Sequence, residues 1–144
     1  MVQRVSEASV SIDGRVAGEI GAGLVVLLGV GRGDGEREAT RLADKVCRLR
    51  LFDDADGRMN RSLLDLGGAG AILCVSQFTL YGDVRRGLRP SFTEAAEPPV
   101  AEALYDAFCR ELEARSVHVE TGRFGARMTV SLKNEGPVTL MVET

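Results

Sequence analysis

The sequence is poor in the residues on which several familiar kinds of site depend. It holds one histidine, no tryptophan and only 5% aromatic residues. Its three cysteines, Cys47, Cys74 and Cys109, lie in apolar stretches and never approach the Cys-x-x-Cys spacing of a zinc or redox site. We therefore expect no zinc site and no cofactor, while the presence of another metal stays open. The free thiols favour a reducing compartment, the cytoplasm.

Long hydrophobic runs and an excess of positive charge are also missing. No run of about 18 apolar residues occurs, and the start from Met1 to Ser6 has no charged segment followed by an apolar one. We therefore expect a protein that is neither secreted nor membrane-bound. The net charge of -3 argues against a protein that coats nucleic acid, and no DNA partner is expected.

Two loops fail as ligand-binding motifs. The segment Gly29 to Gly35 stands where a phosphate loop would, but Asp34 takes the place of the small residue that a dinucleotide fingerprint requires. The acidic turn Asp53 to Gly57 fails as a calcium loop, because Phe52 stands where the first aspartate is needed. We interpret both segments as turns.

A conventional catalytic triad also finds little support. The only histidine, His118, lies between two valines and is interpreted as a strand residue. No Gly-x-Ser-x-Gly elbow surrounds Ser76. The side chains that Ser-His or Cys-His acyl transfer requires are therefore absent.

Hydrophobic periodicity predicts an α+β fold in one domain spanning residues 1–144. Helical spacing predicts a helix over Glu36–Arg50 and a second helix that begins at Pro98. Strand patterns occur at Val2–Ile12, Val16–Ile20, Leu24–Val30, Leu73–Leu80, Val117–Thr121, Ala126–Lys133 and Val138–Val142. We expect a curved, largely antiparallel sheet or barrel with two main helices.

Three arginines, Arg85, Arg86 and Arg89, gather on a segment that also contains glycine and proline. A guanidinium can donate two parallel hydrogen bonds to a phosphate, so this segment is a candidate contact for a nucleic acid. A solvated loop is the alternative, and the arginines alone favour it.

Two short segments are similar to the signature motifs of a known family. Ser76-Gln77-Phe78-Thr79-Leu80 and Asn134-Glu135-Gly136-Pro137-Val138-Thr139 resemble those of D-aminoacyl-tRNA deacylases, the D-tyrosyl-tRNA deacylase family. The flanks agree in order at Val2-Gln3-Arg4-Val5, Arg58-Met59-Asn60, Arg89-Pro90-Ser91-Phe92, the helix from Pro98, and Thr121-Gly122-Arg123-Phe124-Gly125. The resemblance covers the chain from about Val2 to Val142, and two collinear motifs are far more specific than one.

The resemblance implies a homodimeric hydrolase that cleaves the ester bond of D-aminoacyl-tRNAs. In that family each active site combines the Ser76 to Leu80 segment of one subunit with Gly136 and Pro137 of the other. The Gly-Pro bond is cis there, and its carbonyls hold the substrate amino group so that an L side chain meets rigid main chain. We therefore expect broad activity on D-residues and some cleavage of glycyl-tRNA, which has no side chain to reject.

An activated ester needs a placed water and donors for the developing oxyanion more than it needs a strong nucleophile. We expect main-chain N-H groups around Gln77, Phe78 and Thr79 to supply these donors, with help from the neighbouring ribose hydroxyl, as the family's RNA-assisted mechanism implies. No base stands beside Thr79 in the sequence, so its hydroxyl is expected to orient rather than attack. Arg85, Arg86 and Arg89 follow the motif directly and are the candidate contacts to the tRNA acceptor end.

Two other functions remain possible from sequence. One is an RNA-binding module without catalysis, which would need stacking aromatics or a basic face that this composition does not offer. The other is a hydrolase or isomerase acting on a small D-configured molecule without tRNA.

Overall fold

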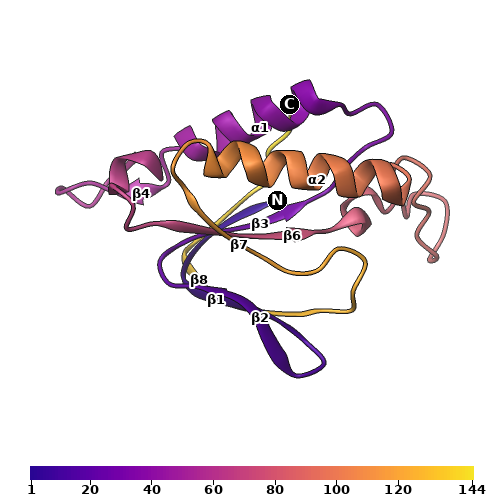
Figure 1. Cartoon of the computed structure of the whole chain (residues 1–144), viewed down its shortest axis with the longest axis horizontal. Coiled ribbons are helices and arrows are strands. Elements are labelled where there is room, and N and C mark those ends of the chain that lie inside the picture. The colour runs from indigo at the N-terminus through magenta and orange to yellow at the C-terminus, as the bar shows by residue number, and fades with distance from the viewer.

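One curved sheet carries two helices on one of its faces (Figure 1). The computed structural model describes all residues from 1 to 144. The elements follow in the order β1 (Val2–Ile12), β2 (Arg15–Ile20), β3 (Gly23–Leu28), α1 (Glu36–Arg48), β4 (Phe52–Asp53), β5 (Met59–Arg61), η1 (Leu64–Leu66), β6 (Ala71–Ser76), η2 (Phe78–Tyr81), α2 (Pro98–Glu113), β7 (His118–Thr121) and β8 (Thr129–Leu140). Both predicted helices are present.

The main sheet has an antiparallel half and a parallel half. Its strands run in the order β2-β1-β3-β6-β7, and β8 pairs with β1. The pairings of β1 with β2, β3 and β8 are antiparallel, whereas β3–β6 and β6–β7 are parallel. A parallel pair needs a long crossover, and α1 and α2 supply the two crossovers here. The largely antiparallel sheet is confirmed, with a parallel half that the strand patterns did not reveal.

The predicted strands differ most from the structure in two places. The strand predicted over Leu73–Leu80 ends at Ser76, and a 3-10 turn follows it, because the apolar run continues through Phe78 and Leu80 without marking the bend. The strands predicted at Ala126–Lys133 and Val138–Val142 form one long strand, β8. Its register moves from Val5 opposite Asn134 to Gln3 opposite Thr139, so residues 135–138 form a bulge opposite Arg4.

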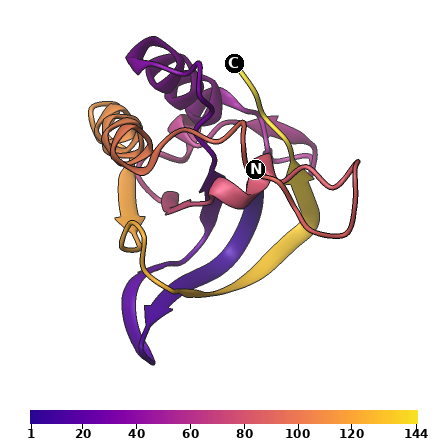
Figure 2. The same ribbon diagram turned by 90° about the vertical axis from the view of Figure 1, so that its right-hand side faces the viewer.

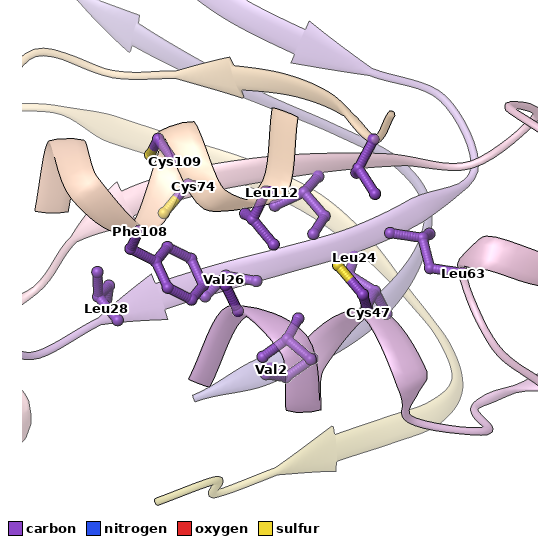
Figure 3. Close-up of a cluster of buried hydrophobic side chains, with 14 of the residues drawn as sticks. Val2, Leu24, Val26, Leu28, Cys47, Leu63, Cys74, Phe108, Cys109 and Leu112 are labelled. Atoms are coloured by element: carbon purple, nitrogen blue, oxygen red, sulfur yellow. The ribbon is translucent and has the colours of Figure 1, made fainter. Parts of the chain in front are cut away.

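The helices bury their apolar faces against the sheet. Glu38 accepts a hydrogen bond from the Gly35 N-H at 3.0 Å, which closes the first turn of α1. Figure 3 shows Phe108 and Leu112 of α2 and Cys47 of α1 gathered over Leu24 and Val26 of β3. No helix in the structure is both long and apolar enough to cross a lipid bilayer.

The opposite face of the sheet is covered by the sheet itself. Val25 of β3 and Leu73 of β6 point away from the helices into a second apolar cluster. Figure 2 shows the strands curling so that β8 comes round toward this face. Three side chains from β8 and the residue before it pack against this cluster: Met128, Val130 and Leu132. This curl leaves a hollow at the end of β6, where the first motif lies.

Candidate functional site

The first motif lies where β6 gives way to the short 3-10 turn η2. The Gln77 N-H donates to the Leu28 carbonyl oxygen of the neighbouring strand at 2.7 Å. Within the turn, the Leu80 N-H donates to the Gln77 carbonyl at 3.3 Å. The N-H groups of Phe78 and Thr79 come before the Leu80 N-H in the chain. They have no acceptor within the turn, because the first N-H groups of a helical turn have no partner in it. The turn therefore presents two main-chain donors at its start.

Side chains of the motif brace the turn rather than form a triad. The Gln77 side-chain amide donates to the Thr79 hydroxyl. Phe78 is 54% exposed, and its ring meets the ring of Phe92 edge-on, with ring centroids 4.9 Å apart. His118 lies on β7, where its ring nitrogen is 3.0 Å from a Glu120 carboxylate oxygen. The histidine is thus a strand residue, as predicted, and it does not line the cavity described next.

A cavity of about 540 Å³ opens beside the first motif. Ser76, Gln77 and Phe78 form one wall, and Thr79 lies just outside it. Most of the other lining residues are apolar. They include Phe92, Ala95, Ala96, Pro98, Ala101, Phe124, Met128 and Val130. Cavities of this size with a mainly apolar lining and a few polar groups suit a small ligand or the end of a larger one.

Two charged side chains at the cavity were not singled out from the sequence. Arg32 and Glu97 both line it, and their charged groups are 3.9 Å apart. Both side chains are exposed, at 61% and 76%, so the ion pair is weak and free to exchange partners. Neither belongs to a recognisable motif, and only the folded chain brings them together. No group of three or more His, Cys, Asp or Glu side chains able to hold a metal occurs.

The second motif lies on the β8 bulge. The Gly136-Pro137 peptide bond is cis, and both residues are exposed. The Asn134 side-chain amide donates to the Arg4 carbonyl at 2.9 Å and to the Val138 carbonyl at 2.8 Å. These bonds hold the two ends of the bulge to each other and to β1.

Arg4 also supports this bulge, and Arg4 is only 7% exposed. Its guanidinium donates to the Leu51 carbonyl at 2.7 Å, to the Asp53 carboxylate at 3.2 Å and to the Glu135 carbonyl at 3.4 Å. Arg4 and Asn134 thus bind the carbonyl oxygens of Glu135 and Val138. The carbonyl oxygens of Gly136 and Pro137 are not used by either side chain.

The two motifs do not meet within one chain. Strands β3 and β1 lie between β6 and β8 in the strand order of the sheet. Neither Gly136 nor Pro137 lines the cavity at Ser76. The structure of the single chain therefore keeps the exposed second motif away from the first.

The predicted arginine cluster lies on a hairpin, residues 83–91, that projects beyond η2 (Figure 2). Asp83 and Ser91 close it through two main-chain hydrogen bonds of 2.8 and 2.9 Å. Arg85 is bound to the Asp83 carboxylate at 2.7 Å, and this hydrogen bond lowers the pKa of Asp83 to about 2. Arg86 and Arg89 line an entirely polar hollow of about 580 Å³, which Arg85, Asp83 and Glu94 also line. Of the three arginines, Arg86 and Arg89 have no carboxylate partner.

Comparison with known proteins agrees with the two motifs. The family model described as D-Tyr-tRNA(Tyr) deacylase matches residues 1–143. A D-aminoacyl-tRNA deacylase of Roseiflexus castenholzii is 57% identical over all of this chain and 90% of its own length, and one of Thermus aquaticus is 57% identical over all of this chain and 93% of its own. A solved structure described as the c-Myc DNA Unwinding Element Binding Protein superposes with a TM-score of 0.91 at 38% identity, over 99% of this chain and 96% of that one. The chain belongs to the D-Tyr-tRNA(Tyr) deacylase family.

Proposed function

We propose that this protein hydrolyses the ester bond of D-aminoacyl-tRNAs to free tRNA and D-amino acid. Its relatives of 57% identity are named D-aminoacyl-tRNA deacylases, and they align over the full chain. The observation that carries the proposal is the η2 turn, which presents two main-chain donors beside a cavity lined by the first motif. The aminoacyl end of the tRNA enters this cavity.

The reaction needs little from side chains. Water attacks the ester carbonyl carbon, the carbonyl oxygen gains negative charge, and the bond to the ribose oxygen then breaks as that oxygen takes up a proton. The Phe78 and Thr79 N-H groups stabilise the oxyanion. The Gln77 N-H is committed to the Leu28 carbonyl, so of the three candidate donors two remain. The neighbouring ribose hydroxyl of the substrate positions the water or relays its proton.

The motif side chains hold this arrangement in place. The Thr79 hydroxyl accepts a hydrogen bond from the Gln77 amide, and no histidine or lysine stands beside it to act as a base. We assign it an orienting role. Ser76 is the last residue of β6 and lies at the cavity wall.

Chirality is read by Gly136 and Pro137 of a partner subunit in a homodimer. Their exposure on the bulge and their distance from the first motif of the same chain support a site completed by a second copy. Their carbonyl oxygens, which neither the Arg4 nor the Asn134 side chain uses, bind the substrate amino group, which directs an L side chain into main chain and leaves a D side chain unhindered. The same geometry accepts any D-residue, and it does not exclude glycyl-tRNA.

The hairpin meets the tRNA acceptor end. It leads directly out of η2, and its free guanidiniums, Arg86 and Arg89, suit phosphate. Arg85 contributes less, because Asp83 already neutralises it. The absence of a DNA partner stays a prediction. The three free, buried cysteines agree with a cytoplasmic location.

The proposal is tested with matched D-tyrosyl-tRNA and L-tyrosyl-tRNA, with and without a chelator. We expect rapid loss of the D-ester alone, unaffected by the chelator. Slower cleavage of glycyl-tRNA is also expected, and its complete resistance at high enzyme would mean that more than steric exclusion operates. If both tyrosyl esters survive, the protein is a binding module instead. If a simple D-tyrosine ester is cleaved as fast as the D-tyrosyl-tRNA, the substrate is a small molecule and not a tRNA.

A further inference from the structure

The segment Gly29-Val30-Gly31, which fails as a phosphate loop, contacts the η2 turn directly. Tyr81, the last residue of η2, lies across it. A Cβ atom placed on Gly31 would be 2.7 Å from the Tyr81 Oη and 3.0 Å from its Cζ. A Cβ atom on Gly29 would be 3.1 Å from Cε2, at the other edge of the ring. The ring therefore packs on bare backbone that only glycine provides.

This segment and the residue before it, Leu28, are hydrogen-bonded to both walls of the cavity. On one side the Leu28 carbonyl accepts from the Gln77 N-H at 2.7 Å. On the other side the Val30 carbonyl accepts from the Ala96 N-H at 2.9 Å. The Gly31 N-H donates to the Asp34 carboxylate at 2.8 Å, which closes a turn directly after these two contacts. The segment is thus the common support of the first motif and of the wall that faces it.

We propose that Gly29, Gly31 and Tyr81 are positioning residues, which set the Phe78 and Thr79 donors at the right place relative to the opposite wall. The inference rests on the proposed function, because it takes those donors as the oxyanion site. The ring of Tyr81 belongs to the same short turn as the donors. A side chain on Gly31 displaces the ring, and the turn moves with it. Donors act over 2.7 to 3.1 Å, so a small displacement is enough to weaken them.

The experiment compares five variants with the wild type. Gly31→Ala introduces the closest contact and Gly29→Ala a milder one. Gly33→Ala is the matched control, because a Cβ at this position of the same loop meets no atom within 4 Å. The double variant Gly31→Ala/Tyr81→Phe removes Oη, the atom nearest to the new methyl group. Tyr81→Phe alone completes the double-mutant cycle. Circular dichroism checks that each variant folds.

For D-tyrosyl-tRNA we expect Gly31→Ala to lower kcat by about 10- to 100-fold, the loss that a shift near 1 Å produces. KM should change by less than about 3-fold, because the interaction lost acts in the transition state. Gly29→Ala should lose less, Gly33→Ala should match the wild type, and the double variant should recover much of the kcat lost by Gly31→Ala. The proposal is overturned if Gly31→Ala keeps wild-type kcat, if Gly33→Ala is equally impaired, or if removing Oη restores nothing.

Amide hydrogen exchange of the peptide covering residues 77–82 gives a readout that does not need activity. Gly31→Ala should speed exchange in this peptide, and the double variant should slow it again. If the wild type fails to cleave D-tyrosyl-tRNA, the proposed function is wrong and the exchange data still decide whether Tyr81 couples the glycines to the turn. If exchange in the peptide is the same in all variants, the positioning role is wrong even for an active enzyme.

Discussion

The N-H group of Phe78 is the smallest feature on which the proposed reaction depends. Phe78 is the first residue of η2, where proline fits the backbone and removes only a hydrogen that the turn does not use. We expect Phe78→Pro to lower kcat for D-tyrosyl-tRNA by about 100- to 1000-fold, as loss of one oxyanion donor does elsewhere. Steady-state kinetics on the folded variant measure this.

The controls separate the main chain from the side chains. Phe78→Ala removes the ring and keeps the N-H group, so it should remain far more active than Phe78→Pro. Ser76→Ala and Thr79→Ala should also keep measurable turnover. Near-complete loss in both, with fold and tRNA binding intact, would mean that a hydroxyl performs the chemistry and that the main-chain mechanism is wrong.

Arg4 shows how a single buried charge supports the second motif. Arg4→Met removes the donors to the Leu51 and Glu135 carbonyls, and an unsatisfied buried carbonyl costs about 1–3 kcal/mol. We expect the free energy of unfolding in urea to fall by about that amount, and the ratio of D-ester to L-ester cleavage to fall as the bulge loosens. An unchanged unfolding curve would show that water replaces the guanidinium without cost.

At the scale of elements, the hairpin 83–91 yields a prediction about tRNA affinity. Arg86→Glu with Arg89→Glu should weaken tRNA binding, and each lost phosphate contact should lower the slope of log Kd against log salt by about 0.7–0.9. Arg85→Gln should change both quantities less, because Asp83 already pairs with that guanidinium. Titrations of labelled tRNA at several salt concentrations measure both. Equal effects of the two sets of substitutions would contradict the assignment.

The elements that the sequence predicted best are those with a long, regular pattern. Both helices begin where predicted, because Pro98 and the acidic start at Glu36 mark their first turns. The η2 turn was missed, since Phe78 and Leu80 continue the apolar run of β6 and only contacts with Leu28 and Gly31 reveal the bend. Periodicity describes the faces of an element and says little about its partners, which is also why the parallel half of the sheet was not foreseen.

The motifs of the site were visible in sequence, but their surroundings were not. Ser76 to Phe78 line the cavity as a candidate site should. Arg32 and Glu97 reach the same cavity from distant loops and carry no local signature. The support of the Gly136 bulge by Arg4 likewise spans more than 130 positions, a distance over which pattern gives no information.

At the scale of the whole molecule, a composite site predicts complementation between subunits. Two inactive variants, Phe78→Pro and Gly136→Ala, are given different tags and co-expressed, and the mixed dimer is purified through both. One of its two sites carries both substitutions and the other carries neither, so about half of the wild-type activity should return. Gly136→Ala is expected to be inactive alone because Gly136 has a φ of 114° and its Cβ would lie 2.8 Å from Val138 Cγ2. A mixed dimer as inactive as its parents would place each site within one chain.

Acid should destabilise the fold below about pH 4. Four aspartates, Asp44, Asp54, Asp65 and Asp83, accept hydrogen bonds that lower their pKa from the ordinary value of 3.8, and for Asp83 the pKa falls to about 2. The unfolded chain therefore binds more protons than the folded one in this range, so stability is complete above the unfolded pKa and is lost as the pH falls through the folded ones. Thermal unfolding between pH 5 and pH 2 should show a falling Tm. A Tm that stays level would mean that these hydrogen bonds do not persist in solution.

In the proposed reaction, the turn at Phe78 places the chemistry on atoms that every residue except proline possesses. Random mutagenesis of this gene would then give an unusual map of damage. Most replacements at the residues nearest the scissile bond would leave the protein active. Inactivating changes would be those that introduce proline into the η2 turn, replace Gly29 or Gly31, or disturb the packing of the turn. A conventional search for an indispensable nucleophile or base in such a map would return none, although the protein is a catalyst.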